Sequence, residues 1–215
     1  MQPLKQFSNV QVVEHPLVQD KLSHIRSLNT EPYLFRQLME EIGYMMGYEL
    51  TRNLPTQPQK VKTPIGVAPS SLIRPENIAI IPILRAGLGM SAGVSKLIPR
   101  ASIGHLGFYR DHTTNHPVEY LSHLPKINGH MIIIVDPMLA TGNTACKAVS
   151  ALKDKNIKGE QMIFLGLVAA PEGLETFCGS HPEINVVVAA IDSHLDKNAF
   201  VVPGLGDAGD RMFDT

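Results

Sequence analysis

The clearest evidence for the fold lies in the segment Met131-Ile-Ile-Ile-Val-Asp-Pro-Met-Leu-Ala-Thr-Gly-Asn-Thr144. Its first five residues form a continuous apolar run, which is typical of a strand buried on both faces of a parallel sheet. Small and polar residues follow, and then Ala145, Ala148, Val149 and Leu152 recur at helical spacing. The segment therefore predicts a strand, a short loop and a helix in succession.

The loop of this segment has the composition of an anion-binding site. Backbone N–H groups converge at a helix N-terminus, and the helix dipole adds positive potential there. Gly142 lets the backbone approach a phosphate closely, and Thr141 and Thr144 can donate hydroxyl protons to it. Asp136 follows the strand, where it could accept hydrogen bonds from ribose hydroxyls. The alternative is an ordinary strand-to-helix turn with a threonine cap, and the Walker spacing is absent.

Further apolar runs recur along the chain, with helical stretches between them at roughly 88–97, 144–155 and 172–180. The runs that we expect to be strands are Ile78–Leu84, Ile103–Tyr109, Met131–Val135, Met162–Val168 and Val186–Ile191. This alternation predicts a single α/β domain over residues 1–215, with a parallel sheet, right-handed crossovers and helices on both faces. Ligands of such sheets bind beyond the carboxyl ends of the strands.

The regions outside this alternation give weaker signals. Apolar spacing predicts an N-terminal helical segment, first over residues 16–28 and then after Thr30, which we expect to cap the second helix. Prolines and glycines punctuate residues 51–76, which favours loops or a short β-hairpin. The segment His112–Lys126 has no helical period and is expected to be a flap or hairpin that projects over the site.

Two arginines follow predicted strands. The stretch Ile80-Ile-Pro-Ile-Leu-Arg-Ala-Gly-Leu-Gly89 delivers Arg85 into a loop of small residues, and Arg110 ends the next strand. Arginine suits bidentate recognition of phosphate, and glycines permit close approach of the backbone. Solvated surface arginines are the alternative for both positions.

The C-terminal stretch Phe200-Val-Val-Pro-Gly-Leu-Gly-Asp-Ala-Gly-Asp-Arg-Met-Phe213 is the most distinctive part of the chain. Its glycines and acids predict no regular element, and a flexible tail is the alternative. Apolar residues at both ends of the stretch are expected to pin it to the body of the protein. Its backbone N–H and C=O groups could then pair with the edge of a small planar base.

These motifs together resemble those of the uracil phosphoribosyltransferases. Val135–Gly142 resembles the family's motif for phosphoribosyl pyrophosphate (PRPP), residues 82–88 its pyrophosphate loop, and residues 203–210 its uracil-binding segment. The resemblance covers nearly the whole chain, including Glu14–Leu17 and Val168–Gly173. The chain departs from common family patterns at three places: Pro137 replaces the second acid of the broader superfamily motif, Asn143-Thr144 replaces Gly-Ser, and Phe200 replaces tyrosine.

The resemblance assigns roles to individual residues. It implies that Arg85, Arg110 and Asp207 are catalytic. The residues implied to bind PRPP are Arg85, Arg110, Asp136, Pro137, Met138, Leu139, Ala140, Thr141, Gly142, Asn143, Thr144 and Asp207. The residues implied to bind uracil are Val201, Gly206, Asp207 and Ala208. The family also leads us to expect a cis peptide bond between Leu84 and Arg85.

The implied reaction joins uracil to PRPP and yields UMP and pyrophosphate, in pyrimidine salvage. Mg²⁺ is expected to arrive with PRPP, so no metal motif of the protein is required. The family further implies a homodimer or homotetramer and, in some members, activation by GTP. The N-terminus has no apolar segment typical of a signal peptide, and no apolar run reaches the length of a membrane span, so we expect a cytoplasmic protein.

Three other functions compete with this interpretation. The first is a regulatory RNA-binding protein built on the same fold, which the net charge of −1 disfavours because RNA binding needs a basic face. The second is a transferase for another nucleobase, and the third is an inactive paralogue. Cys146 and Cys178 are expected to be reduced thiols, and the nine histidines show no metal-binding spacing.

Overall fold

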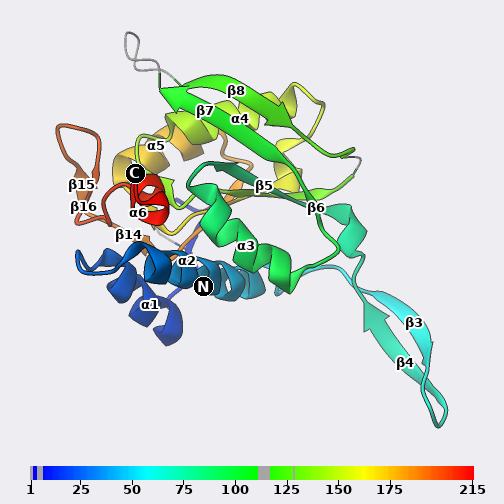
Figure 1. Ribbon diagram of the computed structural model, residues 1–215. Coiled ribbons are helices and arrows are strands. Elements are labelled where there is room, and N and C mark those ends of the chain that lie inside the picture. Colours follow the sequence, from blue (N-terminus) through cyan, green and yellow to red (C-terminus); the bar gives the residue numbers. More distant parts are fainter. Residues whose placement is uncertain (1, 4–6, 111–116, 128) are drawn as a thin grey trace.

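The computed structural model describes residues 2–3, 7–110, 117–127 and 129–215. Its centre is a sheet with the strand order β1-β2-β13-β11-β9-β5-β7-β8, with β6 paired to β5 at one end (Figure 1). The strands are β1 (Gln2–Pro3), β2 (Val10–Val12), β5 (Ile78–Leu84), β6 (Ser102–Ile103), β7 (His105–Arg110), β8 (Pro117–His123), β9 (Met131–Val135), β11 (Met162–Leu165) and β13 (Asn185–Val188).

The sheet is parallel from β2 through β7, and only β1 and β8 pair antiparallel with their neighbours. Both faces of its inner strands are buried. Ile80 and Ile133 belong to one core cluster, whereas Ile81 and Ile134, the next residues along the same strands, belong to the other. The predicted parallel sheet with strands buried on both faces is therefore confirmed.

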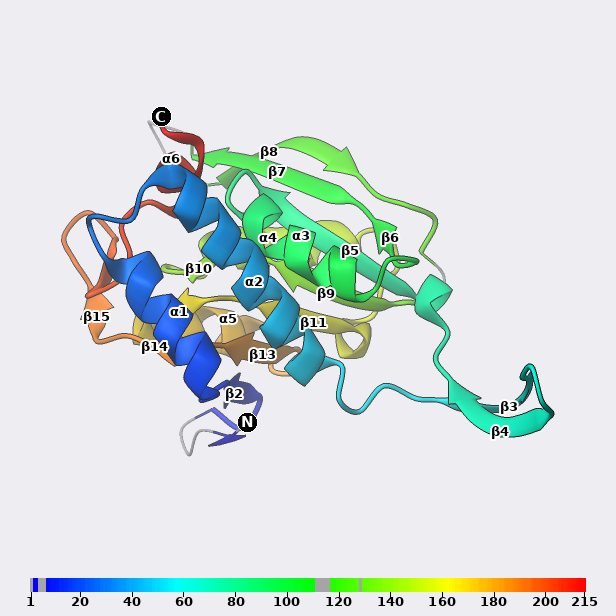
Figure 2. The same cartoon turned by 60° about the horizontal axis from the view of Figure 1, so that its bottom comes forward.

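Helices cover both faces, as predicted (Figures 1 and 2). The helices that contribute to the first core cluster are α1 (Pro16–Arg26), α2 (Pro32–Leu50), α3 (Gly87–Leu97) and α6 (Ala208–Phe213). Those that contribute to the second are α4 (Asn143–Lys153) and α5 (Pro171–Ser180). The N-terminal helical segment is thus packed on the sheet and belongs to the main core.

Helices α2 and α3 approach each other so closely that their backbones touch. A Cβ atom on Gly93 would lie 1.9 Å from the carbonyl oxygen of Glu40, and one on Gly43 would lie 2.1 Å from that of Met90. Real Cβ atoms do not approach backbone atoms this closely, so each position accepts only glycine without a shift of the helices. Because α3 starts at the end of β5, this contact fixes the helix next to the loop that carries Arg85.

Three strands of the sheet break at the same level and continue as a second, smaller sheet. The predicted strand Met162–Val168 is divided into β11 and β12 (Val168–Ala169), and Val186–Ile191 into β13 and β14 (Ala190–Ile191). The chain after β9 likewise turns at Asp136 and resumes as β10 (Met138–Leu139), giving the order β10-β12-β14.

The two proline-rich or aperiodic regions form antiparallel pairs. Residues 51–76 contain the hairpin of β3 (Gln57–Lys62) and β4 (Val67–Leu72), which extends away from the body (Figures 1 and 2). The hairpin alternative is therefore confirmed. The flap predicted for His112–Lys126 lies partly outside the described residues, and Pro117–His123 forms the edge strand β8.

Two local predictions are wrong. Thr30 does not cap the second helix: Glu31 is the N-cap, Pro32 begins the helix, and the Thr30 hydroxyl donates to the carbonyl of His24. The C-terminal stretch does contain a regular element, since α6 forms within it. The Asp207 side chain accepts a hydrogen bond from the amide of Asp210 and so caps this short helix, and Met212 is buried beneath it.

None of the helices in the described residues is both long enough and apolar enough to span a membrane.

Replacing Gly93 with alanine is expected to lower the free energy of unfolding by about 1–3 kcal/mol, because the new methyl group forces α2 and α3 apart. Urea unfolding followed by circular dichroism measures the change. Gly179→Ala is the matched control. Gly179 lies in α5, and a Cβ added there would meet no atom within 4 Å, so alanine should stabilise the helix by about 0.5–1 kcal/mol. Equal stability of the two variants would contradict the proposed helix contact.

Candidate active site

The strand order places a crevice at the ends of β5 and β9. The chain passes from β5 through α3 to β7 on one side of β5, whereas β9 lies on the other side. In parallel α/β sheets, ligands bind at the carboxyl ends of the strands where the order reverses in this way. Arg85 follows β5 and Asp136 follows β9, so the topology brings the two predicted site residues to one place.

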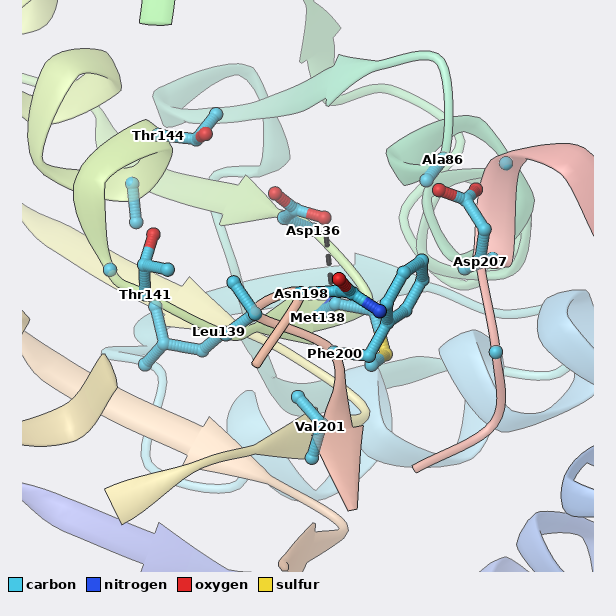
Figure 3. Close-up of a pocket in the computed structure, with 17 residues that line it drawn as sticks. Ala86, Asp136, Met138, Leu139, Thr141, Thr144, Asn198, Phe200, Val201 and Asp207 are labelled. Atoms are coloured by element: carbon cyan, nitrogen blue, oxygen red, sulfur yellow. Dashed lines mark hydrogen bonds between the residues drawn. The ribbon is translucent and has the colours of Figure 1, made fainter. Parts of the chain in front are cut away.

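A cavity of about 450 Å³ lies at this point (Figure 3). Three segments line it: residues 138–142 with 144–145, residues 198–201, and residues 206–209. Ala86 and Asp136 complete the wall. A second cavity of about 270 Å³ shares Ala86, Asp136, Thr144, Asp207 and Gly209 with the first, and Arg85 lines it. The two hollows therefore adjoin and can hold different parts of one extended ligand.

The loop between β10 and α4 has the backbone form of an anion site. Gly142 has a φ of +80° and is the N-cap of α4. The amides in the first turn of α4 have no partners within the helix, and they point back toward this loop, whose residues line the cavity. A Cβ on Gly173, the third residue of α5, would lie 2.2 Å from the carbonyl oxygen of Ala140, which shows how tightly α5 supports the loop. Thr141 and Thr144 line the cavity beside this helix end (Figure 3).

Asp136 occupies the break in the sheet and borders both cavities. The amide of Met138 donates a hydrogen bond of 3.4 Å to its Oδ1 atom (Figure 3). The pKa of Asp136 is raised to about 7, chiefly by burial; the Met138 hydrogen bond opposes the rise, and the nearby carboxylate of Asp207 adds to it. At neutral pH the ligand-free site therefore holds this carboxyl close to the midpoint of its titration.

Arg85 is bound to the C-terminal helix. The peptide bond between Leu84 and Arg85 is cis, as expected. The Nη2 atom of Arg85 lies 3.3 Å from Oδ1 of Asp210, and its guanidinium stands 5.4 Å from the centre of the Phe213 ring. About half of the side chain remains exposed, so a ligand can reach it. Arg110 ends β7, and its side chain lies outside the part that the structure describes.

The C-terminal stretch forms a tight loop over the cavity. We define the base loop as residues 201–207. The bond between Val202 and Pro203 is cis, and Gly204 and Gly206 have φ values of +59° and +78°. Val201, Gly206, Asp207 and Ala208 all line the cavity, as the uracil assignment requires, and Asp207 lies across from Asp136 (Figure 3).

The structure brings together most of the predicted site residues. Of the predicted PRPP loop, Pro137 and Asn143 are not part of the cavity wall that the described residues form: Pro137 is buried and Asn143 is exposed. Sequence analysis missed Asn198 and Ala199, which enter the wall beside Phe200 from the turn between β15 (His194–Leu195) and β16 (Val201–Val202).

The turn that carries these missed residues is held by one carboxylate. Oδ1 of Asp196 accepts hydrogen bonds of 2.8 Å from the amides of Asn198 and Phe200, and Ala199 has a φ of +64°. The sequence Asp196-Lys-Asn198 lies just before the C-terminal motif, and aspartate and asparagine are typical of turns. This pattern could have indicated a turn beside the cavity.

This fold and this site define a type I phosphoribosyltransferase. The structure resembles that of an adenine phosphoribosyltransferase from Trypanosoma brucei, with a TM-score of 0.56 over 96% of this chain and 92% of that chain. At 11% sequence identity this likeness shows the fold alone. The sequence model of the family described as uracil phosphoribosyltransferase matches residues 12–215. The chain belongs to the uracil phosphoribosyltransferase family.

Individual relatives align with this chain over nearly its whole length. The chain is 49% identical to a uracil phosphoribosyltransferase from Ralstonia pickettii, over 97% of this chain and 96% of the relative. It is also 49% identical to one from Paraburkholderia xenovorans, with the same coverage. The solved structure of the AQ2163 protein from Aquifex aeolicus superposes with a TM-score of 0.90 at 32% identity, over 95% of this chain and 97% of that one.

Asp136→Asn is expected to stabilise the ligand-free protein at pH 8. The unfolded chain loses the Asp136 proton near pH 4, whereas the folded protein keeps it up to about pH 7. Stability from this group is therefore greatest below pH 4 and falls as the pH rises to 7. Asparagine has no such loss, so its advantage in urea unfolding should grow by about 2–4 kcal/mol between pH 4 and pH 8.

Asp154→Asn, at the exposed end of α4, controls for the removal of a carboxylate as such. A constant difference between Asp136→Asn and the parent protein across this pH range would contradict the retention of a proton by the partly buried Asp136.

Proposed function

We propose that this chain transfers the phosphoribosyl group of PRPP to N1 of uracil, which yields UMP and pyrophosphate. One observation carries the proposal: a continuous site joins the anion loop at the N-terminus of α4 to a recess lined by residues of the base loop. Membership of the uracil phosphoribosyltransferase family supports the choice of substrates.

The anion loop holds the ribose 5-phosphate part of PRPP in this proposal. The first amides of α4 and the hydroxyls of Thr141 and Thr144 donate hydrogen bonds to the 5′-phosphate. Asp136, at the foot of the same loop, accepts hydrogen bonds from the ribose hydroxyls. Ligand hydroxyls favour the ionised carboxylate, so binding lowers the pKa of Asp136 from its raised value and releases a proton near neutral pH.

Uracil lies against the base loop, with Asp207 at the end of the base that meets the ribose. Val201, Gly206 and Ala208 line the cavity, and in this proposal their backbone groups pair with the donors and acceptors of the imide edge. Asp207 stands where the base meets the ribose, and it orients the base for attack through N1. A loop that reads a base by its backbone discriminates through shape and edge pattern, and a purine presents a larger outline and different donors.

In the reaction, N1 of uracil forms a bond to C1 of the ribose while the bond from C1 to the pyrophosphate oxygen breaks. The electron pair of that bond leaves with pyrophosphate, and the N1 proton passes to Asp207 or to solvent water. Arg85 and Arg110 stabilise the negative charge that grows on pyrophosphate, and the loops hold the two reactants in line. Arg85 is already half exposed beside the second cavity, and pyrophosphate competes with Asp210 for its guanidinium.

Mg²⁺ fits this site as a companion of PRPP. The described residues contain no cluster of three or more metal-binding side chains, whereas Asp136 and Asp207 offer carboxylate oxygens in the cavity wall. Mg²⁺ takes one or two carboxylates together with substrate oxygens and water. When bound, it neutralises charge on pyrophosphate. Activation by GTP, assembly as a homodimer or homotetramer, and a cytoplasmic location remain further parts of the proposal that derive from the family resemblance.

The direct test incubates the purified protein with PRPP, Mg²⁺ and an equimolar mixture of uracil, hypoxanthine and adenine, with and without GTP. Chromatography should show UMP as the main nucleotide, and EDTA should abolish its formation until Mg²⁺ is restored. A purine nucleotide as the main product would favour the transferase for another base. No nucleotide in any condition, together with salt-dependent RNA binding, would favour the regulatory protein.

Arg85→Ala is expected to lower kcat/KM for PRPP by about 100-fold or more, because it removes a cation from the departing pyrophosphate. Steady-state kinetics at saturating uracil measures the loss. Arg100→Ala is the matched control, since Arg100 is an exposed arginine that lies 3.8 Å from Glu76, away from both cavities. Near-normal activity of Arg85→Ala would refute the role given to Arg85.

A further inference from the structure

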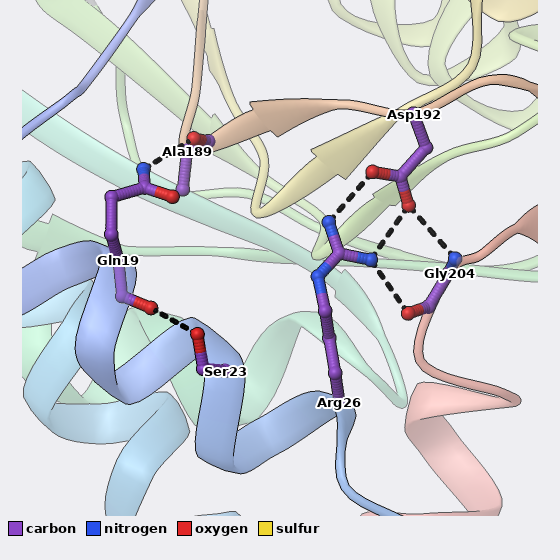
Figure 4. A network of polar contacts seen from close by, with 6 residues as sticks. All are labelled: Gln19, Ser23, Arg26, Ala189, Asp192 and Gly204. Atoms are coloured by element: carbon purple, nitrogen blue, oxygen red, sulfur yellow. Dashed lines mark hydrogen bonds and ion pairs between the residues drawn. The ribbon is translucent and has the colours of Figure 1, made fainter.

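Both backbone polar groups of Gly204, at the centre of the base loop, are held by an ion pair from elsewhere in the chain (Figure 4). Its amide donates a hydrogen bond of 2.8 Å to Oδ2 of Asp192, and its carbonyl oxygen accepts one of 2.7 Å from Nη1 of Arg26. A Cβ on Gly204 would lie 2.1 Å from the carbonyl oxygen of Val201, so the turn is as tight as a glycine allows.

The ion pair is itself bidentate and largely buried. Nη1 and Nη2 of Arg26 lie 2.7 and 2.6 Å from the two carboxylate oxygens of Asp192. The Asp192 side chain is 5% exposed, and the amide of Asp192 is fixed by a hydrogen bond to the carbonyl of Ala169 in the small sheet. Paired charges with satisfied hydrogen bonds in such a setting hold a defined geometry.

A second arginine fixes the next peptide of the loop to the same place. Nη1 of Arg211 donates to the carbonyl of Leu205 and to that of Ile25, each at 2.7 Å, and Nη2 donates to the carbonyl of Ser27. Ile25 and Ser27 flank Arg26 at the end of α1. The carbonyls of Gly204 and Leu205 are thus both tied to the C-terminal end of one helix.

Arg26 and Asp192 are not among the described residues that line either of the two site cavities. Val201 and Gly206, which do line the larger cavity, stand on either side of Gly204 in the chain. Because the ion pair holds Gly204 through both of its backbone groups, it restricts the conformations open to the chain from Val201 to Gly206.

From this arrangement we infer that Arg26 and Asp192 are positioning residues for the base: they set the backbone groups of the base loop that recognise uracil. The inference rests on the proposed function, because it assigns the loop to uracil. It predicts a selective defect. Loosening Gly204 weakens recognition of the base. The anion loop precedes α4 and packs against α5, so its binding of PRPP should not change.

Arg26→Lys tests the inference in the full-length protein. Lysine keeps the charge but lacks the planar fork that contacts Asp192 and Gly204 together. We expect KM for uracil to rise about tenfold or more, with KM for PRPP and kcat within about threefold of the parent protein. Lys21→Met is the matched control: Lys21 also lies on α1, pairs with Glu41, and is 26% exposed against 24% for Arg26. It should leave both KM values unchanged.

Amide hydrogen exchange of the ligand-free proteins gives a readout that needs no activity. Exchange in residues 201–206 should be about tenfold faster or more in Arg26→Lys, and unchanged in Lys21→Met. Asp192→Asn, which keeps the shape of the side chain and an acceptor for Gly204, should show a weaker effect of the same kind. The double variant should be no worse than Arg26→Lys alone, because the two residues act as one unit.

Two results would overturn the inference. The first is unchanged exchange of residues 201–206 in both Arg26→Lys and Asp192→Asn, which would show that the ion pair does not hold the loop. The second is an equal rise of both KM values together with a fall in kcat and stability, which marks a general structural role. Absence of UMP formation by the parent protein refutes the proposed function and, with it, the assignment to uracil, so the parent measurement separates the two failures.

Discussion

The site depends on a break that three parallel strands share. After β9, β11 and β13, the backbone leaves the main sheet and resumes in the small sheet. Hydrogen bonds bridge the gap: the amide of Asp136 donates to the carbonyl of Leu165 at the end of β11, and the amide of Leu167 donates to the carbonyl of Pro137, just before β10 begins. These bonds give backbone groups at the break hydrogen-bond partners, as a buried sheet requires. The break also opens the recess that Asp136 borders, so the loop that follows β10 starts inside the protein and not at its surface.

Several carboxyl groups lie in a site that we propose for a polyanion, which they would repel if all were ionised and unpaired. The protonation and the pairing of these groups reduce that repulsion. Asp136 carries a pKa raised to about 7 by burial and by Asp207, so the ligand-free cavity holds less negative charge than its composition suggests. Asp210 is partly neutralised by Arg85. In the proposed reaction the ribose hydroxyls of PRPP favour the ionised form of Asp136, and the pyrophosphate of PRPP gives Arg85 a more highly charged partner than a single carboxylate.

Local patterns in the sequence were sufficient for the parallel sheet, the anion loop and the base loop, because each depends on periodicity or on a few adjacent residues. Met131–Val135 and the helix after Gly142 are examples. The remaining features depend on distant partners. Arg26 and Asp192 are 166 positions apart, and nothing in the residues around either one indicates the other. The same holds for α6, whose glycine-rich sequence predicts no helix until Asp207 caps it and Met212 finds a buried place beneath α2.

The desolvation cost of the ion pair between Arg26 and Asp192 argues for a role other than stability. Taking two charges out of water opposes folding, and a well-packed apolar pair of the same size would often be at least as stable. An apolar pair, however, has no group that could hold both the amide and the carbonyl of Gly204. A donor and an acceptor together hold the two peptide groups on either side of the Gly204 Cα without using a side chain of the loop itself, and this leaves the neighbouring backbone groups free to meet a ligand. Helix α1, which contributes no described wall to the cavity, is thereby part of the machinery that shapes it.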